Sequence, residues 1–182
     1  MKEKVVYSLD LTVKNTTQTG FKCRHEDVEF RQVVKAVKAL LDSLRRKARA
    51  KGRKWDYCVY GVVSNVSVSR RRVSCYHAHL LFYGSPCSVI VKEAKAYWTS
   101  HGYGNPIQQS LKLCKDYGKV DYVLKHAKVA KDFGLQKREF TQFVGDVGVG
   151  SKEEVFELFG KVLPEAAVVY PYDSWKERFV SC

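Results

Sequence analysis

The sequence lacks the marks of a disulfide-stabilised or membrane protein. Its six cysteines include no C-x-x-C pair, which excludes the usual zinc-ribbon spacings and gives no disulfide framework. No run of apolar residues reaches the roughly 18 that a membrane span needs. The start, Met1 to Lys4, leads into a short alternating stretch and not into a signal-peptide core. We therefore predict reduced thiols and a cytoplasmic protein without membrane association.

Acidic residues are also scarce, with 19 Asp and Glu against 32 Lys and Arg, which gives a net charge of +13 in 182 residues. This excess predicts a polyanionic partner, most often nucleic acid. Residues 145–152 (GDVGVGSK) are rich in glycine but lack the Gly-Lys-Ser/Thr order of a phosphate loop. A nucleotide-driven helicase segment is therefore not expected.

Hydrophobic spacing alternates along the chain between the strand period and the helix period. This order predicts an α+β fold with one antiparallel sheet, ferredoxin-like or RRM-like, whose helices cover one face and leave the other open to solvent. We predict one domain over residues 1–134, with residues 135–182 as a C-terminal extension packed on it. The predicted strands cover residues 4–13, 55–68, 73–83 and 107–113, and the predicted helices cover about 27–48, 89–98 and 116–128, with a capped short helix from 151.

The strand from Val73 to Tyr83 carries the first candidate site. Side chains alternate faces along a strand, so His77 and His79 share one face while Ala78 faces the core. Two neutral imidazoles so placed can bind one metal ion. For an isolated His-x-His pair, an incidental pair of exposed or core histidines is the commoner explanation.

The helix predicted at residues 116–128 carries the second candidate. Its apolar stripe leaves Tyr122 and Lys125, three residues apart, on one neighbouring surface. Taken alone, Tyr122 is best explained as an amphipathic ring at the helix edge. Beside a metal, however, its hydroxyl can attack a phosphodiester, and Lys125 can offset the developing charge.

Cations concentrate at two further places. Seven of the ten residues from Arg45 to Lys54 are Lys or Arg, more than a helix C-terminus needs, and this favours contact with phosphates. Arg70, Arg71 and Arg72 form the turn before the histidine strand. Such a turn is ordinarily a solvated edge, but its arginines can also bind the phosphates of a nucleic-acid backbone. We predict the same contact for Lys119.

Three short motifs in order resemble those of the HUH endonucleases, and most closely the single-tyrosine initiators of rolling-circle replication in small plasmids and viruses. Residues 9–15 (LDLTVKN) resemble the first motif, and residues 76–80 (YHAHL) match the second. Residues 119–125 (KVDYVLK) match the third, a tyrosine followed three residues on by lysine. The resemblance covers roughly residues 5 to 130.

The resemblance implies an enzyme that nicks and joins single-stranded DNA at a replication-origin hairpin, in the cytoplasm of a bacterial or archaeal host that supplies helicase and polymerase. Tyr122 would form a 5′-phosphotyrosine link, and His77 and His79 would hold Mn²⁺ or Mg²⁺, of which imidazoles suit Mn²⁺ better. The family's usual third ligand is a carboxylate on the paired strand, which here has none between Val59 and Val68. Asn65 or Asp10 could take its place.

Other features leave alternatives open. Gly118 stands where some relatives carry the glutamate that supports repeated turnover, and Tyr117 lies about 140° around a helix from Tyr122, so one nucleophile is expected. A related transposase or relaxase uses the same chemistry. The remaining alternatives are a non-catalytic single-stranded nucleic-acid-binding module, and a metal-free phosphodiesterase in which the two histidines act as acid and base.

Overall fold

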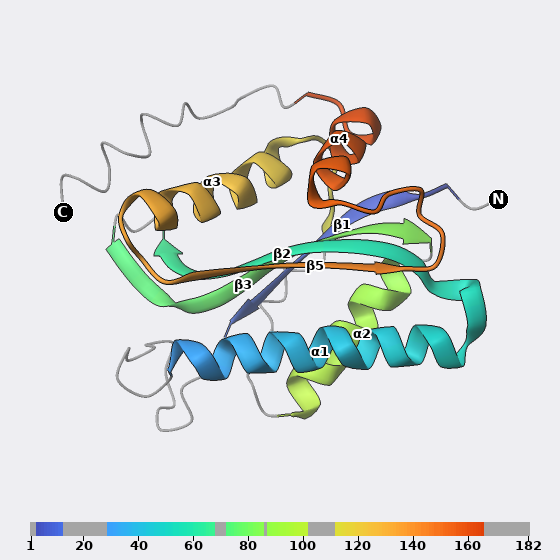
Figure 1. The fold of residues 1–182 in the computed structure, drawn as a ribbon, viewed down its shortest axis with the longest axis horizontal. Coiled ribbons are helices and arrows are strands. Elements are labelled where there is room, and N and C mark those ends of the chain that lie inside the picture. The colour runs from blue at the N-terminus through green and yellow to red at the C-terminus, as the bar shows by residue number, and fades with distance from the viewer. Residues whose placement is uncertain (1–2, 13–28, 68–71, 86, 102–111, 166–182) are drawn as a thin grey trace.

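The structure, a computed structural model, describes residues 3–12, 29–67, 72–85, 87–101 and 112–165. Among these residues, no helix is both long enough and apolar enough to cross a membrane. The elements in chain order are β1 (Val5–Thr12), α1 (Phe30–Ala50), the 3-10 turn η2 (Gly52–Trp55), β2 (Asp56–Ser67), β3 (Arg72–Ser85), α2 (Cys87–Ser100), β4 (Lys112–Leu113), α3 (Gly118–Asp132), β5 (Lys137–Val144) and α4 (Lys152–Val162) (Figure 1).

The five strands form one antiparallel sheet in the order β4-β1-β3-β2-β5. The predicted α+β fold with an antiparallel sheet is therefore confirmed, and the arrangement is consistent with a ferredoxin-like fold. Of the strand predicted at residues 107–113, β4 holds the last two residues, and the rest lies outside the described residues. β3 is the central strand, with β1 on one side and β2 on the other.

Helices cover both faces of the sheet, not one face as the sequence predicted. α1 and α2 pack on one face, and α3 and α4 pack on the other (Figure 1). The reason is that the central strands are apolar on both sides: Leu80 and Phe82 face α1 and α2, while Leu81 faces α3 and α4. Both faces therefore gain by burial. The expectation that His77 and His79 face open solvent is also wrong, because α3 lies over them and leaves His79 only 6% exposed.

The chain after α3 belongs to the same sheet and core. β5 pairs with β2 over its whole length, and α4 contributes Val155 and Phe159 to the core under α3. The sequence did not predict β5, because this edge strand (KREFTQFV) carries polar or charged side chains on both faces and does not show clean alternation. The predicted cap of α4 is confirmed, since Ser151 accepts a hydrogen bond from the backbone N–H of Glu154.

A polar cluster ties β5 to α4 and to β2. Glu139 accepts a hydrogen bond from the Tyr60 hydroxyl at 2.8 Å and forms ion pairs with Lys137, at 3.0 Å, and with Lys152. Burial alone would raise the pKa of Glu139, but the bonds from Lys152, Tyr60 and Lys137 outweigh it and lower that pKa to about 2. The carboxylate therefore stabilises the fold above the ordinary pKa of 4.5, and this contribution is lost as the pH falls from there toward 2.

We expect Glu139→Gln to lower the free energy of unfolding by about 1 kcal/mol at pH 7, because the side chain is partly exposed and water screens its ion pairs. The difference from wild type should shrink as the pH falls below 4.5 and vanish only below about pH 2, where the Glu139 carboxyl is also neutral. Urea unfolding at several pH values measures it. Glu165→Gln, which removes an exposed carboxylate, is the control and should change little. A difference that persists at low pH would show that the glutamine itself perturbs the packing.

Candidate metal and nucleophile site

The register between β1 and β3 places an acidic side chain beside the two predicted histidines. Asp10 lies opposite His79, and Thr12 lies opposite His77. Because side chains alternate between the faces of a sheet, His77 and His79 point to the same side, the side covered by α3. Their ring centroids are 4.7 Å apart. The strand alternation read from the sequence is thus what brings these two rings together.

α3 supplies the other groups of the site. Lys119, Tyr122 and His126 are three and four residues apart, so they lie on one side of the helix, and that side faces β3. The Tyr122 ring centroid is 5.4 Å from that of His79 and 4.4 Å from that of His126. The structure therefore places the predicted nucleophile directly beside the predicted metal ligands.

His126 is the residue that sequence reasoning missed. Its ring centroid lies 5.7 Å from that of His77 and 4.6 Å from that of His79, and ligand atoms of the three residues lie within 4.8 Å of one another. The sequence signal was its position four residues after Tyr122, on the same helix face. That signal became meaningful only when α3 was placed over β3. We call His77, His79 and His126 the histidine cluster.

The environment of His126 favours a neutral ring. Burial, reinforced by the nearby charges of His79, His77 and Lys119, lowers the pKa of His126 well below its ordinary value. His126 is only 1% exposed, whereas His77 is half-buried. Neutral imidazole is the form that binds a metal ion. The cluster therefore needs no deprotonation at His126 before it can act as a ligand set.

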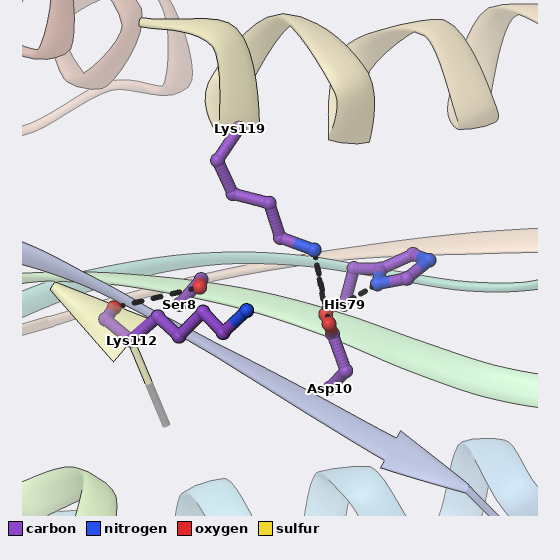
Figure 2. Close-up of polar contacts among 5 residues, drawn as sticks. All are labelled: Ser8, Asp10, His79, Lys112 and Lys119. Atoms are coloured by element: carbon purple, nitrogen blue, oxygen red, sulfur yellow. Dashed lines mark hydrogen bonds and ion pairs between the residues drawn. The ribbon is translucent and has the colours of Figure 1, made fainter. Parts of the chain in front are cut away.

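Asp10 orients His79. Its Oδ1 lies 2.5 Å from Nδ1 of His79 (Figure 2). Because a carboxylate can only accept, Nδ1 carries the ring proton and donates a hydrogen bond to Asp10. Nε2 of His79 is buried and has no hydrogen-bond partner among the residues that the structure describes. A carboxylate on one ring nitrogen and a bare second nitrogen is the usual arrangement of a metal-binding histidine and its supporting acid. The donor set thus fits a metal ion.

Lys119 completes this polar group. Its ammonium lies 3.0 Å from each carboxylate oxygen of Asp10 (Figure 2) and 4.8 Å from the centroid of the Tyr122 ring. Burial would raise the pKa of Asp10, but His79 and Lys119 outweigh it and lower the pKa to about 2. Asp10 is therefore a carboxylate at neutral pH, and it is committed to His79 and Lys119. Asp10, one of the two alternatives for a third metal ligand, therefore supports the site from outside the histidine cluster.

Asn65, the other alternative, lies where the register between β2 and β3 shifts, between Ser64 and Val66. Such a shift marks a β-bulge, and it occurs two residues after Val62, the partner of His79. The Oδ1 atom of Asn65 is buried and makes no hydrogen bond to a described residue. No contact places Asn65 at the histidine cluster, so its role as a ligand stays a prediction.

Lys125, the lysine of the third motif, lies on α3 with its ammonium 2.5 Å from the carboxylate of Asp121. It is only 8% exposed. Lys119, one turn before the tyrosine and assigned to DNA binding from the sequence, lies with its ammonium 4.8 Å from the centroid of the Tyr122 ring. The structure thus offers two lysines for the role expected of Lys125, and only their variants can separate them.

The remaining predicted residues lie elsewhere. Arg70 and Arg71 are outside the described residues, and Arg72 is described only as the first residue of β3, so their contact with DNA stays a prediction. Tyr117 precedes α3 and packs against the core cluster under α4, while Tyr122 contacts His79 and His126. Tyr122 also packs against that core cluster, and the expectation of one nucleophile stays a prediction.

The Tyr122 hydroxyl is protonated in the resting site. Burial, together with the charge of Asp10, raises the pKa of Tyr122 to about 12. At neutral pH the phenol must therefore lose its proton as it reacts, and a neighbouring positive charge would favour that loss. Lys119 and an ion in the histidine cluster are the two positive charges that this geometry can supply.

Comparison with known proteins adds no relative to these observations. No family model, curated protein or solved structure matches the chain significantly.

Proposed function

We propose that the protein is a metal-dependent endonuclease that nicks and rejoins single-stranded DNA through a covalent link to Tyr122. The observation that carries this proposal is the convergence of a half-buried tyrosine with three histidines and with a lysine paired to an acid. The buried Nε2 atom of His79 has no hydrogen-bond partner among the described residues, which is what a metal-binding nitrogen would show before the ion binds. The resemblance to single-tyrosine replication initiators supports the same chemistry.

The histidine cluster is the proposed metal site. An all-imidazole ligand set suits Mn²⁺ better than Mg²⁺, which prefers oxygen ligands and keeps its water. A bound divalent ion would polarise the scissile phosphate and offset its negative charge. Asp10 would hold the His79 ring in place for that ion, because its hydrogen bond fixes which ring nitrogen is bare.

The reaction proposed for Tyr122 balances without another reactant. The phenol oxygen forms a bond to phosphorus, the bond from phosphorus to the 3′-oxygen breaks, and the phenol proton ends on the departing 3′-hydroxyl. The result is a 5′-phosphotyrosine and a free 3′ end. Lys119 would attract the phosphate and favour loss of the phenol proton. Attack by a 3′-hydroxyl on the phosphotyrosine reverses these steps and joins two strands.

The biological substrate we propose is the hairpin of a replication origin, cut to start rolling-circle replication in a cell whose own helicase and polymerase extend the new end. The positive charge of +13 supports a nucleic-acid substrate. A transposase with this chemistry would act on a different hairpin but would form the same covalent link.

The test is a covalent-adduct assay with Mn²⁺ and single-stranded DNA carrying hairpins of the protein's own replicon. A label on the 3′ end should migrate with the protein on a denaturing gel, and a label on the 5′ end should appear on a short free product. Tyr122→Phe should lower adduct formation by at least about a thousandfold, since it removes the nucleophile. Tyr117→Phe is the matched control and should retain the adduct.

Each other result contradicts a distinct part of the proposal. Cleavage without an adduct, in chelator, would assign the reaction to histidines acting as acid and base. An adduct that forms with Tyr122→Phe but not with Tyr117→Phe would identify Tyr117 as the nucleophile. Binding of DNA with no cleavage in any metal would identify a non-catalytic nucleic-acid-binding module.

A further inference from the structure

The outer side of α1 concentrates the positive charge of the protein far from the histidine cluster. α1 contains seven Lys and Arg residues and a single acidic residue, Asp42, so it holds six of the thirteen net positive charges. It packs on the face of the sheet opposite to α3 (Figure 1). The charge is therefore not part of the site that holds Tyr122.

Five of these seven cations form one continuous stripe. Arg31, Lys35, Lys38, Arg46 and Arg49 are all exposed, and their spacing of three, four or eight residues keeps them on one side of the helix. The stripe is about 27 Å long at 1.5 Å per residue. Asp42 falls within it but is already paired with Arg45 at 3.1 Å. We call these five residues the α1 stripe.

The stability of α1 does not require this charge. A helix favours cations in its last turn, where Lys47 and Arg49 lie. Arg31, by contrast, lies in the first turn, which contains no acidic residue and where the helix dipole disfavours a cation. The apolar residues of α1 already pack against the sheet. The α1 stripe thus carries a small cost in the free protein that a bound polyanion would relieve.

We propose that the α1 stripe binds the phosphate backbone of a nucleic-acid duplex. Single strands are usually bound by cations together with exposed aromatic rings on which bases stack. The exposed residues of α1, all of whose residues are described, include no aromatic ring. An anionic membrane would be bound by a helix that also offers exposed large apolar residues, whereas the large apolar residues of α1 are buried or half-buried. Straight rows of cations without stacking rings match a duplex backbone, which is read without regard to sequence.

This surface adds a second nucleic-acid contact to the proposed function without depending on it. If the proposed nicking activity is correct, the paired stem of the substrate would rest on α1 while the reactive single strand reaches Tyr122 on the other face of the sheet. The α1 stripe itself needs neither Tyr122 nor a metal ion, so its test is made without either.

The experiment measures binding of a blunt 20-base-pair DNA duplex of arbitrary sequence, in chelator, over a range of salt concentrations. The variant carries Arg31→Gln, Lys35→Gln, Lys38→Gln and Arg49→Gln, which keep helix-forming side chains at exposed positions. We expect its affinity to fall at least tenfold near 0.1 M salt, and the slope of log affinity against log salt to flatten by about 3 to 4, because each lost phosphate contact removes about 0.9.

The matched control removes the same charge elsewhere, through Lys115→Gln, Lys128→Gln, Lys131→Gln and Lys161→Gln, all at exposed positions outside α1. Under the proposal, the control changes duplex affinity by less than threefold, and both variants keep the thermal stability of wild type. Equal losses in the two variants would overturn the proposal, because net charge alone would then explain binding. Stripe-dependent binding of single strands or anionic vesicles, with no preference for the duplex, would also overturn it.

Discussion

We expect His126→Leu to abolish the proposed metal-dependent activity while leaving the protein folded. Leucine has a similar size and no polar atom, so at a site that is 1% exposed it keeps the packing and removes the ligand. Loss of one of three ligands should weaken Mn²⁺ binding by about a hundredfold or more, since even outer partners of such ligands are worth 10–100-fold. Adduct formation should fall by about a thousandfold, in keeping with several kcal/mol of charge stabilisation by the ion.

Two measurements separate this role from that of an ordinary core histidine. Calorimetry measures Mn²⁺ affinity directly, and thermal unfolding measures the stabilisation that Mn²⁺ confers on wild type. We expect both signals to be lost in His126→Leu, with metal-free stability unchanged or increased. His101→Leu is the control, because His101 is exposed at the end of α2 and stacks on Tyr97, with ring centroids 3.9 Å apart. Unchanged Mn²⁺ affinity in His126→Leu would reduce His126 to a packing residue.

Lys119→Met should slow adduct formation by about 10–100-fold. This loss is smaller than the roughly 100–1,000-fold seen when a buried charge-stabilising group is removed, because Lys119 is partly exposed. Without its ammonium, the Asp10 carboxylate near the Tyr122 ring would repel the DNA phosphate. Mn²⁺ affinity should be retained or rise, since a neighbouring positive charge is removed. Single-turnover adduct kinetics with saturating Mn²⁺ measure the effect.

Lys125→Met is the companion variant, because motif resemblance favours Lys125 where the geometry favours Lys119. We expect a rate change of less than about threefold and a loss of about 1–2 kcal/mol in stability, since its ion pair with Asp121 is removed from a nearly buried position. Should Lys125→Met lose the larger share of the rate and Lys119→Met little, the role would belong to Lys125. Comparing the rate losses of the two variants therefore shows which lysine acts on the phosphate, whichever variant loses more.

Local patterns predicted most of the elements of this fold. Helical spacing predicted α1 from about residue 27, three residues before its observed start at Phe30, and strand alternation predicted β1, β2 and β3 with Ala78 facing the core. These signals are strong because a long amphipathic helix and a half-apolar strand each display their period within one segment. β5 was missed because its side chains show no alternation of apolar and polar residues, and it is ordered as a strand by its pairing with β2.

Local patterns likewise predicted only some residues of the candidate site. The His77 and His79 pair was readable because two residues on one strand share a face whatever the fold. Asp10 was considered as a ligand, but its register opposite His79 makes it the residue that orients that ligand. His126 gave no usable signal, because a single histidine on a helix acquires meaning only from what the helix covers.

The sequence by itself determined most of the secondary structure, the positive charge, the shared face of the two strand histidines and the position of Tyr122 on a helix. These depend on periods and composition within short segments. Only the tertiary structure decided that α3 lies over the histidine face, that His126 joins the histidine cluster, and that Lys119 reaches Asp10. Such contacts join residues up to 109 positions apart. They follow from the burial of both faces of the sheet, a property of the whole chain that no local pattern contains.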